Sequence, residues 1–204
     1  MRARRRREGF GRPKDAAPRR GPPAPPPALG ERPYRITFVC TGNICRSPMA
    51  EVVTRSLADA TELRDGSALG SHLDVRSAGT GPWHEGETMH GLALDALGRA
   101  GYPRHAHSAR QVRAAELGAL DLVLSLDRRH QQTLRGLGAD PDRLMLLRAF
   151  DPSAGAAADV PDPYYGDDAV FDECLEMVEA ACEGLVSSLD TNWDSLWGAV
   201  PARD

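Results

Sequence analysis

The chain has 204 residues, of which 41% are hydrophobic, and this length and composition suit a single globular domain. The formal net charge is −4, but residues 1–32 contain ten Arg or Lys and three Asp or Glu, so the rest of the chain is strongly acidic. An acidic domain argues against a general nucleic-acid-binding surface, and any affinity for anions must be local. No apolar run is long enough to span a membrane, and four cysteines in a chain of this length do not predict a disulfide scaffold.

Residues 1–33 are predicted to be a disordered basic extension. They contain eight of the 16 prolines, and such a segment buries too little apolar surface to offset the entropy of ordering. No apolar stretch follows the arginine run, so the segment lacks the pattern of a secretory signal. We favour a solvated tail, or a start codon assigned too early, over an arm for nucleic acid or anionic lipid or a proline-rich recognition segment.

Residues 34–190 alternate between apolar strand patterns and helical patterns, which is typical of a parallel sheet flanked by helices. Strands are predicted at 35–39, 74–77, 121–126 and 144–147, and helices at 48–59, 89–100, 128–137 and 167–189. Gly101 and Gly138 lie where helix C-terminal glycines are expected. Residues 191–204 are interpreted as a tail in which a short helix docks the apolar side chains of Trp193, Leu196, Trp197 and Val200 on the domain.

The segment CTGNICRSP, residues 40–48, directly follows the first predicted strand and leads into the first helix. A cysteine, a short loop with Gly42 and Asn43, and an arginine at a helix N-terminus form a phosphate-sized anion cradle with a thiol at its base. Backbone N–H groups and the positive end of the helix favour a bound dianion, and the same field stabilises a thiolate at Cys40. Asn43 is expected to adopt a positive φ, because the loop must curl around one phosphate and asparagine tolerates that conformation.

These residue types match the requirements for hydrolysis of a phosphate monoester: an in-line nucleophile, charge stabilisation on three equatorial oxygens, and a proton for the leaving oxygen. Cys40 is the predicted nucleophile, and Arg46 can pair with two equatorial oxygens through its planar guanidinium. Ser47 is predicted to donate its hydroxyl to the Cys40 sulfur, to cap the helix, or to do both. No cluster of residues has metal-ligand spacing, and this chemistry requires no metal or other cofactor.

The loop segment, together with Asp162-Pro163-Tyr164-Tyr165, resembles the low-molecular-weight protein tyrosine phosphatases, in particular their bacterial members. The resemblance covers roughly residues 34–189, including Ser77-Ala78-Gly79-Thr80, Trp83-His84 and residues 107–111. It implies an α/β fold, a small doubly wound four-stranded parallel sheet with helices on both faces, in which the phosphate loop follows the first strand. It also implies that Ser77 and His107 hold the side chain of Asn43, so that His107 is a structural brace rather than a catalytic base.

Asp162 is the general acid that this resemblance selects over its neighbours Asp159, Asp167 and Asp168. Pro163 restricts the backbone of Asp162 to an extended conformation, which places its carboxyl group on a defined loop. Asp162 would protonate the leaving phenolic oxygen and then, as a carboxylate, activate the water that cleaves a phosphocysteine.

Aromatic residues are predicted to wall a cleft above the phosphate. Trp83, Tyr164 and Tyr165, with the Thr41 side chain, would stack on a flat aromatic substrate. A deep cleft reaches phosphotyrosine while it keeps the shorter phosphoserine away from Cys40. The predicted site consists of the catalytic Cys40, Arg46 and Asp162, the loop residues Thr41, Gly42, Asn43, Ile44, Cys45 and Ser47, the cleft residues Trp83, Tyr164 and Tyr165, and the supporting Ser77 and His107.

The expected partner is a phosphotyrosine-containing protein, such as a bacterial tyrosine kinase or a host protein reached after release. A thiol enzyme requires a reducing compartment, so a cytoplasmic location is expected, with leaderless release as an alternative. The domain is expected to be a monomer that binds neither nucleic acid nor membrane.

Three other functions are compatible with a loop of this kind. Thioredoxin-coupled arsenate reductases require a further redox cysteine pair in mid-chain, but no cysteine lies between Cys45 and Cys174. Protein arginine phosphatases place threonine where this chain has Ile44, and they lack the paired tyrosines. A phosphopeptide-binding module without catalysis is disfavoured by the simultaneous presence of Cys40, Arg46 and Asp162.

Of the three remaining cysteines, Cys45 has two interpretations. Cys45 lies five positions after Cys40, so it could capture an oxidised Cys40 as a disulfide, or it could merely fill space beneath the loop. Both interpretations stay open. Cys174 and Cys182 are predicted to pack as small buried apolar side chains.

Overall fold

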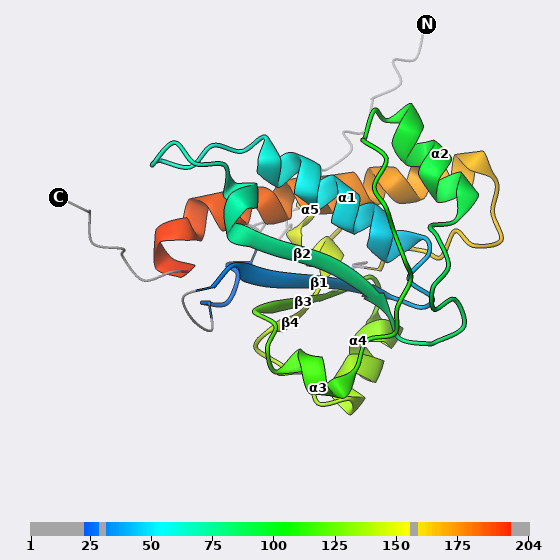
Figure 1. The fold of residues 1–204 in the computed structure, drawn as a ribbon, viewed down its shortest axis with the longest axis horizontal. Coiled ribbons are helices and arrows are strands. Elements are labelled where there is room, and N and C mark those ends of the chain that lie inside the picture. Colours follow the sequence, from blue (N-terminus) through cyan, green and yellow to red (C-terminus); the bar gives the residue numbers. More distant parts are fainter. Residues whose placement is uncertain (1–22, 29–31, 156–158, 197–204) are drawn as a thin grey trace, which may run out of the picture.

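The computed structural model describes residues 23–28, 32–155 and 159–196, and its centre is a sheet of four parallel strands (Figure 1). The strand order is β2-β1-β3-β4, and every neighbouring pair is parallel. The strands are β1 (Tyr34–Cys40), β2 (Leu73–Gly79), β3 (Leu122–Ser125) and β4 (Leu144–Leu146).

Helices cover both faces of this sheet (Figure 1). One face carries α1 (Arg46–Asp59), α2 (Gly91–Arg99) and α5 (Asp168–Leu196), and the other carries α3 (Ala114–Leu117) and α4 (Arg128–Gly136). Two 3₁₀ turns, η1 (Leu69–His72) and η2 (Leu147–Phe150), precede β2 and follow β4. The predicted doubly wound α/β fold is therefore confirmed.

Burial on both faces explains why the strands have nearly continuous apolar sequences. Ile36 and Phe38 of β1 belong to the larger core cluster beneath α1, α2 and α5, whereas Val39 belongs to a second cluster that includes Leu117 of α3 and Leu134 of α4. β1 thus connects two apolar layers, and its last residue is held firmly at the carboxyl edge of the sheet.

The eight predicted elements are all present, with small shifts at their ends. α1 begins at Arg46, two residues before the predicted start, and the short α3 was not predicted. Gly101 and Gly138 have φ values of 86° and 90°, as expected for glycines that end helices.

The predicted tail helix differs more. α5 continues without a break to Leu196, because Trp193 and Leu196 extend the apolar stripe of Leu189 at helical spacing. Trp197 and Val200 lie outside the described residues.

Residues 23–28 lie against the domain, in contrast to the disorder expected for residues 1–33. The carbonyl of Pro23 accepts a hydrogen bond from Ser188 Oγ (2.9 Å), that of Pro26 from Tyr34 Oη (2.7 Å), and that of Pro27 from Arg143 Nη1 (2.9 Å). A proline-rich segment has few backbone donors to satisfy and loses little conformational freedom on docking. Sequence composition alone does not reveal whether the fold places hydrogen-bond donors where they can reach its carbonyls. Residues 1–22 and 29–31 lie outside the described part of the chain.

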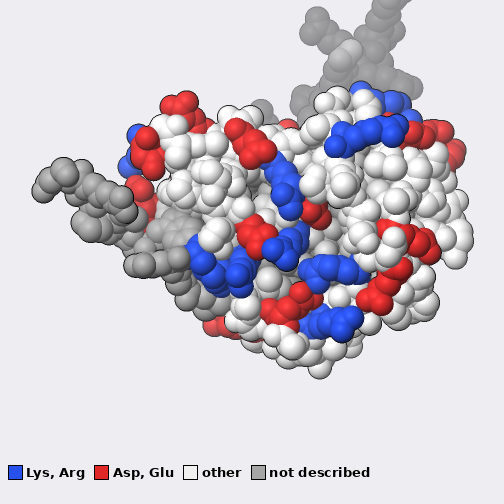
Figure 2. Space-filling model, viewed as in Figure 1, with Lys and Arg blue, Asp and Glu red and all other residues white. Residues whose placement is uncertain are grey.

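The strand order places a topological switch point between β1 and β3, where open α/β sheets bind their ligands. The face seen in Figure 2 carries acidic and basic side chains that are intermixed rather than separated by sign. Over the described residues, we find no helix with the length and apolar character needed to cross a bilayer.

Candidate active site

The phosphate loop joins the buried end of β1 to the first turn of α1. Asn43 has a φ of 59°, as predicted for a loop that turns this tightly. The end of β2 lies against the loop: Thr80 N donates to Cys40 O (2.8 Å), and Gly81 N donates to Thr41 O (3.0 Å). A Cβ at Gly79 would lie 2.7 Å from Thr41 O, so only glycine permits this close approach. The loop is therefore fixed by its backbone as well as by its side chains.

Asn43 is the buried brace of the loop. Its Nδ2 donates to Ser77 Oγ (2.8 Å) and to Ser47 Oγ (3.0 Å), while its Oδ1 accepts from Arg110 N (3.0 Å). The expected contact with Ser77 is present. His107 differs from the expectation, because its Nε2 lies 2.6 Å from the main-chain carbonyl of Asn43 rather than from the side chain.

Burial explains the protonation state that suits His107 to this position. Desolvation lowers the pKa of His107 below its ordinary value, although the hydrogen bond to the Asn43 carbonyl and the charge of Glu51 act in the opposite direction. A neutral ring with its proton on Nε2 donates to the carbonyl, which fits a brace.

The Cys40 sulfur lies 3.0 Å from Ser47 Oγ. Because Asn43 donates to Ser47, the single proton of the Ser47 hydroxyl is available to Cys40, with the Ala78 carbonyl (3.2 Å) as the competing acceptor. No side chain caps the start of α1, and its first turn, which lies wholly within the described residues, has no acidic residue. These features leave a positive helix end and a hydroxyl donor beside the thiol.

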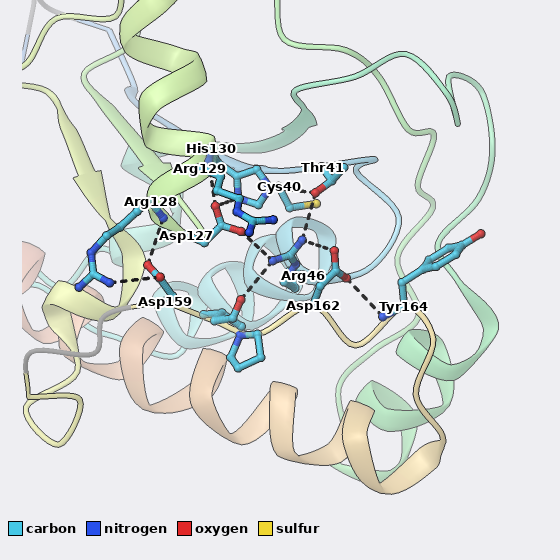
Figure 3. Close-up of polar contacts among 12 residues, drawn as sticks. Cys40, Thr41, Arg46, Asp127, Arg128, Arg129, His130, Asp159, Asp162 and Tyr164 are labelled. Carbon is cyan, nitrogen blue, oxygen red and sulfur yellow. Dashed lines mark hydrogen bonds and ion pairs between the residues drawn. The ribbon is translucent and has the colours of Figure 1, made fainter.

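Arg46 is 2% exposed and its guanidinium is almost fully engaged (Figure 3). Nη1 donates to Asp127 Oδ2 (3.1 Å) and to Val160 O (3.1 Å). Nη2 donates to Asp162 Oδ2 (2.5 Å) and to Thr41 Oγ1 (3.1 Å), whereas Nε has no partner among the described residues. The predicted anion-binding arginine and the predicted acid are thus directly paired.

Asp127 and His130 complete this cluster, and sequence reasoning missed both. Burial acts to raise the pKa of Asp127, but the contacts of its carboxylate with the ring and the backbone N–H of His130 and the charge of Arg46 outweigh it, so the pKa lies well below its ordinary value. Asp127 caps α4 by accepting from His130 N (2.8 Å). One signal was available: Asp127 directly follows a predicted strand, and His130 lies in the first turn of the next predicted helix, at the sheet edge where ligands bind.

The structure separates Asp162 from the competing aspartates. The Asp159 carboxylate accepts from the backbone N–H of Arg128 (3.0 Å), and Asp168 pairs with Arg99 (2.9 Å). Asp167 accepts from Val170 N (3.2 Å) at the start of α5. Asp162 is the one of the four that lines the cleft above Cys40, and its side chain is 48% exposed there.

The cleft has a volume of about 330 Å³. Its rim is aromatic: Trp83 is 68% exposed, Tyr164 38% and Tyr165 97%, and the two tyrosine rings meet edge to face with centroids 4.9 Å apart. His84 also lines the cleft, next to Gly42, and its Nδ1 lies 2.8 Å from Glu87 Oε2. The lining residues are Cys40, Thr41, Gly42, Ile44, Cys45, Arg46, Trp83, His84, Asp162, Tyr164 and Tyr165.

All four cysteines are buried and free. Burial raises the pKa of Cys45 far above its ordinary value, and the neighbouring Cys40 and Asp162 act in the same direction, so Cys45 is a protonated thiol. Burial likewise raises the pKa values of Cys174 and Cys182 to about 12, which fits small apolar side chains. Among the described residues, no cluster of His, Cys, Asp or Glu is arranged to bind a metal ion.

A parallel α/β sheet with a thiol-based anion loop, a buried arginine and a carboxyl group above it defines a thiol-dependent phosphatase. The model of the low molecular weight phosphotyrosine protein phosphatase family matches residues 35–195. The chain belongs to this family, and the predicted resemblance and enzyme class are confirmed.

Individual relatives agree. The low molecular weight protein-tyrosine-phosphatase of Streptomyces coelicolor is 47% identical over 160 residues, which cover 76% of this chain and 93% of the relative. The crystal structure of YfkJ from Bacillus subtilis has a TM-score of 0.70 and 32% identity, and the match covers 81% of this chain and 99% of that one. A structure of the YwlE arginine phosphatase has a TM-score of 0.63 and 28% identity, with 76% and 95% of the two chains covered.

Proposed function

We propose that Cys40, Arg46 and Asp162 carry the phosphatase reaction of this protein and that its substrates are phosphotyrosine residues of proteins. One observation supports these roles best: the thiol, the guanidinium and the carboxyl group line one cleft, although Cys40 and Asp162 are 122 residues apart in the chain. A non-catalytic binding module would not need a carboxyl group at this place.

The roles follow from the chemistry of each group. The Cys40 thiolate attacks phosphorus as the bond to the phenolic oxygen breaks, and protonated Asp162 gives its proton to that oxygen. The Asp162 carboxylate then accepts a proton from the water that attacks phosphocysteine, which releases phosphate and restores the thiolate. Arg46 neutralises the equatorial oxygens throughout. The substrate phosphate must replace the Asp162 carboxylate at Nη2 of Arg46, since that carboxylate occupies Nη2 in the free protein.

Phosphoarginine is the alternative substrate that the likeness to YwlE brings into consideration. Two features favour phosphotyrosine. Ile44 presents a branched apolar side chain to the cleft, which suits a phenyl ring better than a guanidinium group. Tyr164 and Tyr165 offer ring faces and edges for stacking above the phosphate.

The location and partners follow from the same chemistry. A cysteine nucleophile works as a free thiol, so we propose that the protein acts in a reducing compartment, the cytoplasm by default. A bacterial tyrosine kinase is the proposed kind of substrate, and a monomer has all the proposed catalytic residues in one chain.

The test is turnover of an aryl phosphate and of peptides that carry phosphotyrosine or phosphoarginine. Wild type should hydrolyse the aryl phosphate and the phosphotyrosine peptide. Cys40→Ser should abolish turnover while it leaves the fold intact, as judged by circular dichroism. Cys182→Ser is the matched control, because this buried cysteine contacts Ala50 O (3.8 Å) and is not among the residues that line the cleft. Unchanged turnover in Cys40→Ser would contradict the assignment, and faster turnover of phosphoarginine would replace the proposed substrate.

A further inference from the structure

The imidazole of His130 lies behind the phosphate loop, in the first turn of α4 (Figure 3). Its Nε2 is 2.9 Å from Thr41 Oγ1. Its Nδ1 lies 3.0 Å from Asp127 Oδ1, a close polar contact whose geometry is not that of a regular hydrogen bond. The residue is 4% exposed and does not line the cleft, so it reaches the site only through its neighbours.

The two neighbours of His130 contact opposite ends of one guanidinium. Thr41 Oγ1 accepts a hydrogen bond from Nη2 of Arg46 (3.1 Å), and Asp127 Oδ2 accepts from Nη1 (3.1 Å). His130, Thr41, Arg46 and Asp127 therefore form a closed ring of polar contacts beneath the cleft. A displacement of the imidazole would change both contacts of Arg46 at once.

Hydrogen-bond accounting gives Thr41 a defined hydroxyl orientation. The Asp127 carboxylate beside Nδ1 favours a proton on that nitrogen, which leaves Nε2 as an acceptor. The hydroxyl of Thr41 has one proton, and this proton is then directed to His130. A lone pair of Oγ1 remains for Nη2 of Arg46. Without His130 the hydroxyl rotates freely and this contact of Arg46 loses its fixed partner.

The alternative is that His130 merely fills space in the helix packing. Burial of an imidazole for packing alone would be costly, because both of its nitrogens would need partners in the core. Here both nitrogens face residues that contact Arg46. Leu134, one helical turn further along α4, is fully buried and supplies apolar packing in the second core cluster.

We propose that His130 is a positioning residue that fixes the Thr41 hydroxyl and the Arg46 guanidinium for binding of the substrate phosphate. This inference rests on the proposed role of Arg46. It concerns phosphate binding rather than proton transfer, so a measurement of phosphate binding tests it whether or not the protein turns over the proposed substrate.

The experiment measures the dissociation constant of inorganic phosphate by calorimetry, together with KM and kcat for an aryl phosphate. His130→Leu removes both polar contacts, whereas His130→Gln keeps an amide group at the reach of Nε2. His130→Asn keeps a polar group near Asp127 but is too short to reach Thr41, and it serves if the leucine variant does not fold.

Leu134→Ala is the matched control, because it weakens α4 packing without touching the ring of contacts. Thr41→Val provides the background that lacks the hydroxyl.

His130→Leu and His130→Asn should weaken phosphate binding about three- to tenfold, which corresponds to the usual net worth of one hydrogen bond. KM should rise similarly with a smaller change in kcat, because the contact acts on bound phosphate in the ground and transition states alike. His130→Gln should stay near wild type, and in the Thr41→Val background His130→Leu should add little.

Two results would overturn the proposal: an unchanged phosphate dissociation constant in His130→Leu or His130→Asn, or an equal loss in Leu134→Ala. Absence of turnover in wild type would instead refute the proposed reaction and leave the phosphate series to decide the role of His130.

Discussion

The phosphate loop and the aromatic rim of the cleft are built in opposite ways. In the loop, Asn43, Arg46 and Ser47 are buried, and each makes at least two hydrogen bonds. On the rim, Trp83 and Tyr165 are among the most exposed large apolar side chains of the described chain. The loop is held by residues from β2, α4 and two loops, whereas the rim is held by ring contacts of Tyr164 with Tyr165, His84 and His90.

This difference separates two tasks. Phosphate has the same size and charge in every monoester, so a prebuilt cradle with fixed donors binds it at little reorganisation cost. The group that carries the phosphate differs among substrates, and exposed rings can stack on it without a unique fit. Changes in the loop should therefore affect chemistry strongly, and changes on the rim should affect substrate affinity weakly.

After the nucleophile Cys40, Asp162 should give the largest effect, because it belongs to the rim segment in sequence but to the loop cluster by its contact with Arg46. Asp162→Ala should lower kcat for phosphotyrosine roughly 10²–10⁴-fold, the usual contribution of general acid catalysis. The loss should be smaller for an aryl phosphate with an activated leaving group, which barely needs protonation. Asp159→Ala, in the same segment, should change kcat little, and equal losses with both substrates would show that Asp162 is not the acid.

Ile44 tests the cleft floor, where the loop meets the substrate ring. Ile44→Thr should raise kcat/KM for phosphoarginine relative to phosphotyrosine by about tenfold, since it replaces apolar surface with a hydroxyl. Ile44→Val is the matched control, because valine has nearly the shape of threonine but no hydroxyl. If both variants shift the ratio equally, size rather than polarity discriminates the substrates.

Tyr165 tests the rim. Tyr165→Ala should raise KM for a phosphotyrosine peptide about two- to fivefold with little change in kcat, in keeping with the energy of a single ring pair. Tyr165→Phe, which keeps the ring, should match wild type. A large loss of kcat in Tyr165→Ala would mean that the rim also positions Asp162.

Asp127 tests how strongly the loop anchors depend on pH. Its pKa is lower in the folded protein than in the unfolded chain, so its carboxylate stabilises the fold above the ordinary pKa of about 3.9, and this stabilisation is lost as the pH falls toward the folded pKa. Asp127→Asn should therefore reduce the free energy of unfolding at pH 6 by about 2 kcal/mol, as expected for hydrogen bonds to a charged group.

The difference between wild type and Asp127→Asn should shrink below pH 4, because the carboxyl group then takes up a proton in the unfolded chain while it stays ionised in the folded protein. Urea unfolding of the two proteins at pH 6 and pH 3.5 measures it. A difference that stays constant with pH would show that the asparagine acts through packing rather than charge.

Much of this molecule was predictable from local patterns. Apolar runs gave the positions of all four strands, because a strand buried on both faces needs continuous apolar residues. The short loop around an anion required a residue that tolerates positive φ, which Asn43 supplies. Asp162 was identified by its place before Pro163, and the structure confirms only its position in the cleft, while its role stays a prediction.

Other features depended on partners that are distant in sequence. The docking of residues 23–28 and the main-chain contact of His107 could not be predicted, because each depends on where another element's carbonyl or hydroxyl lies. Asp127 and His130 were overlooked for the same reason, since a carboxylate and an imidazole in a helix N-terminal turn are common without any site beside them.

The sequence by itself determined the fold class, the thiol, the arginine and the curl of the loop, because hydrophobic periodicity and turn conformation are local properties of the chain. Only the tertiary structure decided how Arg46 is satisfied. Its partners are residues 41, 127, 160 and 162, which come from the loop itself, the start of α4 and the segment before α5. A buried charge must find such partners wherever the fold brings oxygens near, and that proximity is set by the packing of the sheet and helices.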